Sequence, residues 1–364
     1  MHIHSLRISN FRNFHNLDVD FSDGINIFFG SNGSGKTNLL EALFTLCLGR
    51  SQRGAVDSVL VRQTEDVYRL QGELEAQERR HDVAVAYQRG GRKKITIDGS
   101  NVKIAELFDS FCAVASGPED SEILSGPPSS RRLFLDIYLS QLSRKYLNDL
   151  TDYYRALAQK NAALKNQMDP SPFEPLLVSY GSRVMALRSS ALRTLKMLAS
   201  DYYSRISGGE KMMLRYDSSV AIDEDEESLD RIETAFQLRL DDYCAKERIL
   251  KNSLVGPHRD DITFEIADKP ARTHGSQGQW RTAAISLKLG IYHLLKEKRR
   301  VTPILLLDEI FAELDTSRAT ALMQEFGEFK QLFLTTAIEP PREMGERGQR
   351  YRIDSGRIEQ RVKV

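Results

Sequence analysis

The hydrophobic pattern divides the chain into three parts. Near the N-terminus, and again after about residue 250, short apolar runs and apolar–polar alternation such as that of residues 17–21 predict β-strands. Between these parts, apolar residues recur at spacings of three, four and seven, which is typical of amphipathic helices. The pattern therefore predicts an α/β fold, with residues 1–128 and 251–364 forming one discontinuous lobe and residues 129–250 a helical lobe.

Within these parts, the expected elements can be placed more closely. Residues 64–104 alternate on both sides of the turn at residues 89–92, which predicts a β-meander. Two long amphipathic helices are expected on either side of a proline-rich turn at residues 170–175, packed antiparallel, with a third helix over residues 232–243. Acidic residues 223–227 are expected to form an exposed loop.

One glycine-rich stretch lies between a predicted strand, residues 25–29, and a predicted helix that follows it. It matches G-x-x-x-x-G-K-[ST], the pattern of a phosphate-binding loop. Glycine lets backbone N–H groups approach phosphate oxygens, Lys36 would contact the β- and γ-phosphates of ATP, and the Thr37 hydroxyl would hold Mg²⁺. The candidate nucleotide-binding residues here are Gly30, Ser31, Asn32, Gly33, Ser34, Gly35, Lys36, Thr37 and Asn38.

A second candidate stretch lies at residues 304–309. Four consecutive aliphatic residues predict a strand buried on both faces, as in a parallel sheet, and Asp308 and Glu309 follow at its carboxyl end. Asp308 is the expected Mg²⁺ ligand, and Glu309 is expected to polarise the water that attacks the γ-phosphate. A core strand that ends in solvated acids would give the same letters, but the presence of Lys36 favours the catalytic interpretation.

Composition narrows the class of protein further. Lys plus Arg and Asp plus Glu both number 51, so net charge gives no argument for nucleic-acid binding. No apolar run approaches the length of a membrane span, and the N-terminus lacks the layout of a signal peptide. Three widely spaced cysteines argue against a disulfide framework or a C-x-x-C metal site. We expect a cytoplasmic protein without a membrane partner.

The segment at residues 276–279, Ser-Gln-Gly-Gln, precedes a predicted helix ahead of Asp308. A serine and a glycine at a helix N-terminus can present N–H groups and a hydroxyl to a phosphate. In ABC-type ATPases such a segment serves the nucleotide of a second subunit, which makes Ser276 and Gly278 candidates, together with Asp315 in the loop after Glu309. Residues 207–210, Ser-Gly-Gly-Glu, match the signature by letter but are expected to be a glycine turn that ends a helix.

Several motifs taken together resemble the RecF family of bacterial recombination mediators, which is related to SMC heads. The resemblance runs from end to end. It rests on residues 10–14, 37–42, 126–127 with 131–136, 256–261 and 276–279.

The resemblance implies an ABC-type, SMC-head-like P-loop ATPase core with an N-terminal β-meander and a helical insertion. It implies an ATP-dependent homodimer that binds DNA at single-strand gaps, hydrolyses ATP weakly, and works with RecO and RecR to load RecA. Arg12, in the loop ahead of the phosphate site, can reach the nucleotide; a solvated loop arginine is an equal alternative on spacing alone.

Some roles stay open. Many ABC-type relatives have a histidine after the last core strand, where this chain has Thr335 and Thr336, and residues 116–120 lack the expected metal-coordinating glutamine. A transporter ATPase subunit would share the loop and the acidic strand, but the long helices disfavour it, and no guanine-specific motif supports a GTPase. The basic candidates for DNA contact are Arg50, Arg53, residues 89–94, Arg131, Arg132, Lys296, Lys298, Arg299 and Arg300.

Overall fold

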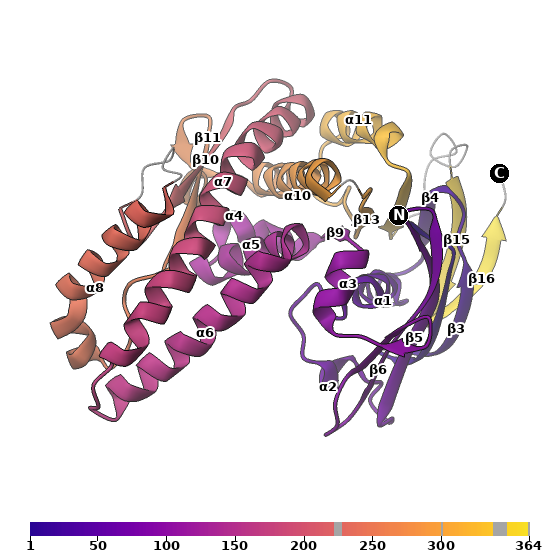
Figure 1. The fold of residues 1–364 in the computed structure, drawn as a ribbon. Helices are drawn as coiled ribbons and strands as arrows, with labels where there is room; N and C mark the ends of the chain where they lie inside the picture. The colour runs from indigo at the N-terminus through magenta and orange to yellow at the C-terminus, as the bar shows by residue number, and fades with distance from the viewer. Residues whose placement is uncertain (222–227, 300, 338–347, 363–364) are drawn as a thin grey trace. The chain divides into compact units, whose positions relative to one another are not determined.

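The computed structural model describes residues 1–221, 228–299, 301–337 and 348–362, with side chains described as far as residue 358. The chain divides into two compact units, drawn together in Figure 1. The first consists of Met1–Asp120 and Lys288–Val364, and the second of Ser121–Leu287. The acidic residues 223–227 and Arg300 lie outside the described residues.

An antiparallel sheet forms one layer of the first unit. It runs in the order β3-β2-β5-β6-β7-β8, and β1 also pairs with β5. In β2, Leu6 and Ile8 are buried while Arg7 is exposed, so the alternation predicted from the sequence sets which face is core. The strands are β1 (His2–Ile3), β2 (Ser5–Phe11), β3 (Phe14–Asp20), β5 (Val67–Ala76), β6 (Arg79–Gln88), β7 (Lys94–Ile97) and β8 (Ser100–Asn101). The predicted meander over residues 64–104 is confirmed.

A second, mostly parallel sheet carries the candidate site. Its order is β16-β15-β4-β14-β13-β9, and only the β15–β16 pair among these neighbours is antiparallel. All residues of β13 are buried, as its aliphatic run predicted. The strands are β4 (Gly24–Phe29), β9 (Ala113–Ser116), β13 (Ile304–Leu307), β14 (Gln331–Thr336), β15 (Gly348–Asp354) and β16 (Arg357–Val362). Parallel pairing brings the carboxyl ends of β4, β13, β14 and β9 to one edge.

Helix α1 (Lys36–Leu48) packs against strands of both sheets, among them β5 and β6 of the antiparallel sheet and β9 and β14 of the other (Figure 1). This explains why α1 is buried on almost every side, since a helix that is apolar all round belongs in a core. The first unit also contains α2 (Asp57–Leu60), α3 (Ile104–Ser110), α11 (Thr316–Glu325) and η3 (Phe326–Glu328), and η1 (Pro118–Ser121) lies at its boundary with the second unit.

The second unit is mainly helical. It contains α4 (Glu122–Ser125), α5 (Pro128–Leu142), α6 (Arg144–Lys165), η2 (Ser171–Phe173), α7 (Glu174–Ser207), α8 (Leu229–Leu250) and α9 (Ala271–His274). The helices α6 and α7 form the expected antiparallel pair, and α8 is the expected third helix. The prediction of one continuous first helix is wrong, because the helix is interrupted at Ser143, where α5 ends and α6 begins. The Ser143 hydroxyl accepts a hydrogen bond from the Tyr146 amide and caps the start of α6.

Residues 251–287 pack within the second unit, although the sequence grouped them with the discontinuous lobe. The reason is a small sheet in which β11 (Asp261–Ile266) pairs antiparallel with β10 (Met212–Asp217) and also with β12 (Lys269–Pro270). The division into functional lobes at residues 129 and 250 stays a prediction. Helix α10 (Gln277–Arg299) begins in the second unit and ends in the first.

Two simpler expectations can be compared directly. Cys47, Cys112 and Cys244 are free thiols, as their spacing predicted. Across the described part of the chain, every helix is too short or too polar to span a bilayer.

Candidate nucleotide-binding and hydrolysis site

At two positions of the loop between β4 and α1, a side chain would collide with neighbouring atoms. At Gly30, with φ +155°, an ideal Cβ would lie 2.2 Å from the backbone oxygen of Ile353. At Gly35, with φ +113°, it would lie 2.6 Å from the Asn13 side-chain nitrogen. Both positions therefore require glycine, in agreement with the predicted phosphate-binding loop.

Lys36 lies over this loop. Its Nζ donates to the backbone oxygens of Gly30 at 2.8 Å and Ser31 at 3.0 Å, and it is 3.3 Å from Glu309 Oε1. The side chain is 3% exposed, so its charge acts in a poorly solvated place. Within the described chain, the buried Ser34 Oγ has no hydrogen-bond partner and no side chain caps the start of α1. These free polar groups at a helix N-terminus fit a phosphate.

Thr37 and Asp308 meet at the carboxyl edge of the parallel sheet. The Thr37 hydroxyl donates to Asp308 Oδ1 at 3.0 Å. The Thr335 hydroxyl donates to the same oxygen at 2.5 Å, and itself accepts from the Glu309 amide at 2.9 Å. A hydroxyl beside a carboxylate is the oxygen set that Mg²⁺ prefers, so the residues fit the predicted metal ion.

Asp308 is a buried acid whose pKa is raised above its ordinary value. Burial raises its pKa, and the hydrogen bonds from Thr335 and Thr37 oppose that rise. The Glu119 carboxylate raises the pKa further, and the Arg53 guanidinium lowers it. Arg53 donates to Glu119 Oε1 at 2.6 Å and lies 3.9 Å from Asp308 Oδ2. Arg53, a candidate for DNA contact, is thus paired with acids beside the site.

Glu119 belongs to the segment in which the sequence analysis sought a metal-coordinating glutamine. This segment is held in place by Lys288 of α10, whose Nζ donates to the Ala115 oxygen at 2.7 Å and lies 2.9 Å from Asp120 Oδ1. The other oxygen of Asp120 accepts from the Gly117 amide at 2.8 Å. The segment therefore brings an acid, rather than a glutamine, close to Asp308.

Glu309 has a left-handed backbone, with φ +44°. For a residue other than glycine this conformation costs roughly 1–3 kcal/mol and is concentrated at functional sites. Its amide is fixed by Thr335, while its carboxylate is partly exposed and faces Lys36. The strain thus turns the side chain toward the phosphate loop.

The Arg12 side chain is mostly buried, and its guanidinium is held by an acid of α1. Arg12 also has a left-handed φ of +54°. Its guanidinium donates to both carboxylate oxygens of Glu41, at 2.8 and 3.0 Å, and Glu41 is fully buried in α1. The Ser51 hydroxyl donates to Glu41 as well, at 2.5 Å. The alternative of a solvated loop arginine is wrong, and the nucleotide contact of Arg12 stays a prediction.

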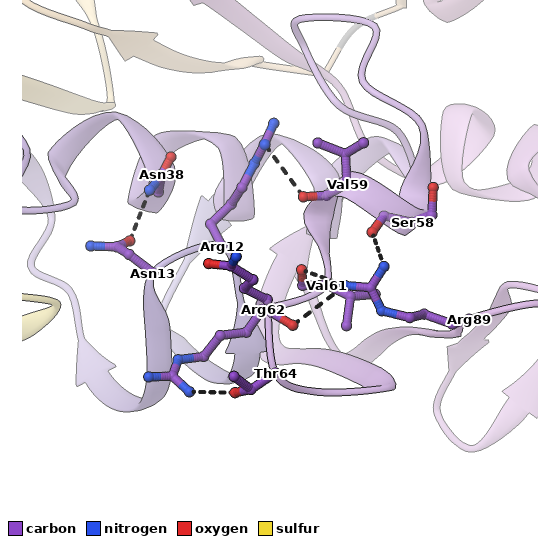
Figure 2. A pocket seen from close by; sticks show the side chains of 10 residues that line it. Arg12, Asn13, Asn38, Ser58, Val59, Val61, Arg62, Thr64 and Arg89 are labelled. Atoms are coloured by element: carbon purple, nitrogen blue, oxygen red, sulfur yellow. Dashed lines mark hydrogen bonds between the residues drawn. The ribbon is translucent and has the colours of Figure 1, made fainter.

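A pocket of about 790 Å³ adjoins the loop, and Figure 2 shows its side chains. Asn38 and Asn13 lie on the side of the phosphate loop. Asn38 donates to Asn13 Oδ1 at 2.8 Å, and Asn13 donates to the Ser34 oxygen at 3.3 Å. The remaining lining residues are Arg12, Ser58, Val59, Val61, Arg62, Gln63, Thr64 and Arg89. Its volume lies in the range of small-molecule sites.

In the second unit, the Ser-Gln-Gly-Gln segment forms the start of α10. The Gln279 amide donates to Ser276 Oγ at 3.2 Å and the Ser276 amide donates to Gln279 Oε1 at 2.9 Å, which is a capping box. Ser276 is exposed and Gly278 partly exposed. The signature candidates therefore lie at an accessible helix N-terminus, as expected.

The signature-like residues 207–210 do end a helix, as predicted, because α7 stops at Ser207 and Gly208 takes φ +78°. They are nevertheless close to the preferred signature in space. Glu210 accepts a hydrogen bond from Gln279 Nε2 at 2.7 Å. The sequence analysis missed this contact, which joins two segments far apart in the chain.

Asp315 caps the helix that follows the Glu309 loop. It accepts from the Arg318 amide at 2.9 Å and the Ser317 hydroxyl at 2.8 Å, and these bonds lower its pKa. The carboxylate is exposed, so it is ionised and accessible in the first unit.

Several candidate DNA contacts instead hold the fold together. Arg131 is 3% exposed and donates to both oxygens of Asp261. Lys93 donates to the Gly49 oxygen and pairs with Asp57, and Arg299 donates to the Phe108 and Asp109 oxygens. Arg92 and Lys94 remain exposed on the hairpin. The charge of these residues in the sequence did not distinguish those that bond within the fold from those that are exposed.

Sequence reasoning also missed Thr335, Glu41 and Asn13. Asn13 stands in the Asn-Phe-Arg-Asn-Phe motif, and Glu41 lies one helical turn after Thr37, so both could have been found from their spacing. Thr335 was noted only in place of an expected histidine. Its bonds depend on which strands are neighbours in the sheet.

Comparison with known proteins matches this geometry. Residues 2–351 match the family model described as RecF/RecN/SMC N terminal domain. A DNA replication and repair protein RecF from Symbiobacterium thermophilum is 35% identical over 341 residues, which cover 92% of this chain and 91% of that protein.

Solved structures agree. A structure described as the recombination mediator protein RecF with ATP in the RecFOR pathway superimposes with a TM-score of 0.90 at 30% identity, covering 99% of this chain and 97% of that one. An SMC head bound to the C-terminal winged-helix domain of ScpA has a TM-score of 0.56 at 15% identity, covering 100% and 98%, and shows the fold alone. The expected SMC-head-like fold is confirmed.

Proposed function

This chain belongs to the RecF family, and we propose that it is an ATP-dependent clamp that binds DNA at single-strand gaps in recombinational repair and replication restart. In this proposal it dimerises when it binds ATP, helps RecO and RecR load RecA, and leaves DNA after slow, DNA-stimulated ATP hydrolysis. The observation that carries the proposal is the convergence of Lys36, Thr37, Asp308 and Glu309 at one sheet edge.

Each of these four residues has a distinct proposed role. Lys36 binds the β- and γ-phosphates, moving from the loop carbonyls and Glu309 that it contacts here. Thr37 and Asp308 would hold Mg²⁺, which neutralises phosphate charge when it is bound. Glu309 orients the attacking water and accepts its proton. Because Thr335 fixes the Glu309 backbone, the carboxylate needs little reorganisation to act.

We assign the base and ribose of ATP to the pocket beside the loop. Asn38 and Asn13 mark the end of the pocket that adjoins the phosphates, and residues 58–64 form the opposite wall (Figure 2). Its polar and arginine-rich lining suits ribose hydroxyls and an aromatic base.

We propose the dimer because two exposed segments have groups that could bind a nucleotide but have no role in the site formed by their own chain. Ser276 and Gly278 present a hydroxyl and amides at a helix N-terminus, and Asp315 presents an ionised carboxylate. In this proposal they complete the site of a second subunit. ATP then holds the dimer closed, and its hydrolysis opens it.

The proposal is tested by measuring ATP turnover against protein concentration, with and without gapped duplex DNA. Specific activity should rise with concentration, and DNA should shift the rise to lower concentration, because the site is shared between subunits. Lys36→Ala should lose nucleotide binding. Ser276→Arg should still bind ATP but stay monomeric, because the larger side chain keeps Ser276's segment away from the γ-phosphate of the ATP bound to the second subunit.

Two results would count against the clamp. Flat specific activity that DNA does not change would mean that each subunit hydrolyses ATP alone. A Ser276→Arg protein that still dimerises with ATP would remove Ser276 from the interface.

A further inference from the structure

The wall of the pocket opposite the phosphate loop is a segment with little packing of its own. Residues 57–65 contain the single-turn helix α2 and lead into β5. Val59 is 54% exposed, and Gln63 and Thr64 are exposed as well. Leu60 and Val61 are the buried residues of this segment, and its other side chains are at least partly exposed, so the position of the segment depends largely on hydrogen bonds.

Arg89 supplies four of these bonds through its guanidinium. It follows β6, and its own amide donates to the Asp66 oxygen at 2.8 Å. Its guanidinium donates to the backbone oxygens of Glu65 and Ser58, both at 2.9 Å, and more weakly to those of Val61 at 3.3 Å and Arg62 at 3.5 Å. Figure 2 shows the guanidinium directed at the Ser58 and Val61 oxygens. A rigid fork of donors reaches several carbonyls at once, which an ammonium cannot do in the same geometry.

The same segment is attached on its other side to the turn between β2 and β3. The Arg12 amide donates to the Leu60 oxygen at 2.8 Å, and the Arg62 amide donates to the Asn10 oxygen at 2.9 Å. Asn10 and Arg12 both have φ +54°, so this turn is itself strained. The wall is thus held between a strained turn and Arg89, and its place decides the width of the pocket.

We propose that Arg89 is a positioning residue that sets the affinity for the nucleoside part of ATP by fixing residues 58–65, without contact to the phosphates. The inference rests on the proposed function, which places base and ribose in this pocket. All three guanidinium nitrogens already donate to backbone oxygens, so Arg89 acts through the segment. Loss of the guanidinium should let the wall move and weaken nucleoside contacts, while the phosphate loop stays intact.

The test compares two ligands on folded protein. ATP occupies both pocket and loop, whereas inorganic tripolyphosphate contacts the loop alone. In Arg89→Met, ATP should bind about tenfold more weakly, as expected for the loss of one to two net hydrogen bonds, while tripolyphosphate should bind as it does to the wild type. The KM for ATP should rise with little change in kcat.

Arg92→Met is the matched control, because Arg92 lies on the same hairpin and is exposed. It should bind both ligands as the wild type does. Arg89→Lys keeps the charge but not the fork, so it should also lose ATP affinity; charge alone would predict rescue. Should Arg89→Met not fold, the same comparison on Arg89→Lys decides.

Three outcomes would overturn the inference: unchanged ATP affinity in both Arg89 variants, equal weakening for ATP and tripolyphosphate, or full rescue by lysine. A wild-type protein that binds neither ligand would instead refute the proposed function.

Discussion

At the scale of single residues, His258 shows how packing fixes a protonation state. The Tyr153 hydroxyl lies 2.5 Å from Nδ1, and Nε2 lies 3.2 Å from the Ser253 oxygen. Tyr153 can donate to Nδ1 while Nε2–H donates to Ser253, an arrangement that suits a neutral ring. The pKa of His258 is lowered to about 4. Burial is the largest cause, the hydrogen bond to Ser253 opposes it, and the nearby cations Arg259, Arg132 and Lys160 also lower the pKa.

This shift makes stability depend on pH in a defined window. The unfolded chain, with a histidine pKa of about 6.5, takes up a proton that the folded protein does not bind until the pH approaches 4. Stability is therefore lost as pH falls below 6.5, by about 2 kcal/mol between pH 7.5 and pH 5. Urea unfolding of the wild type and of His258→Asn at the two pH values isolates this contribution.

The asparagine variant should be less sensitive to pH than the wild type by that amount. His274→Asn, which changes an exposed histidine, should keep the wild-type sensitivity. Identical pH dependence in the wild type and His258→Asn would contradict the assignment.

At the scale of elements, three chain segments meet through one hydroxyl. Thr335 of β14 is fully buried and bonds both the Asp308 carboxylate, at the end of β13, and the Glu309 amide. Thr37, in the first turn of α1, shares the same carboxylate. Thr335 is therefore placed to fix the metal ligand and the proposed base together.

We expect Thr335→Val to destabilise the protein by about 1–3 kcal/mol, because the Asp308 carboxylate and the Glu309 amide each lose the hydrogen bond that the Thr335 hydroxyl makes. The pKa of Asp308 should rise further, since a hydrogen bond that favours the carboxylate is lost. More Mg²⁺ should then be needed for half-maximal ATP turnover. Thr335→Ser keeps the hydroxyl and should behave as the wild type. A valine variant with unchanged Mg²⁺ dependence would show that Thr335 is not needed to hold Asp308.

The elements also show where prediction from sequence ends. The phosphate loop and the strand before Asp308 were predicted because their signals are local: glycine spacing in one case and an aliphatic run in the other. The helix break at Ser143 was missed because the apolar spacing continues across it. The role of Thr335 depends on the β13–β14 register, which places Leu307 opposite Leu334. Arg89 was grouped with the basic candidates for DNA contact, because its partners are backbone oxygens, which leave no mark in the sequence.

At the scale of the whole molecule, the proposed chemistry is divided between the two units. The phosphate loop, Asp308 and Glu309 lie in the first unit, while Ser276 and Gly278 lie in the second. In the proposed dimer, the signature of one chain acts on the nucleotide of its partner. Bound ATP should therefore hold the protein as a dimer, and a variant that cannot hydrolyse ATP should stay dimeric.

Glu309→Gln tests this link between chemistry and assembly. Glutamine keeps the size of the side chain but cannot accept the proton of the attacking water, so turnover should fall by about 10²–10⁴-fold. ATP should still bind, because the substitution leaves Lys36 and the phosphate loop unchanged and removes only a negative charge beside Lys36 Nζ. Light scattering after removal of free ATP should find a dimer that outlasts the wild-type dimer.

Adding Ser276→Arg to Glu309→Gln should return the protein to a monomer that still binds ATP, because the second subunit can no longer reach the nucleotide. This double variant separates slow hydrolysis from the interface that hydrolysis is proposed to open. If the single variant hydrolyses ATP at the wild-type rate, Glu309 is not the base. If hydrolysis stops but the dimer dissociates as fast as the wild-type dimer, ATP turnover does not control opening, and the clamp must be released by another event.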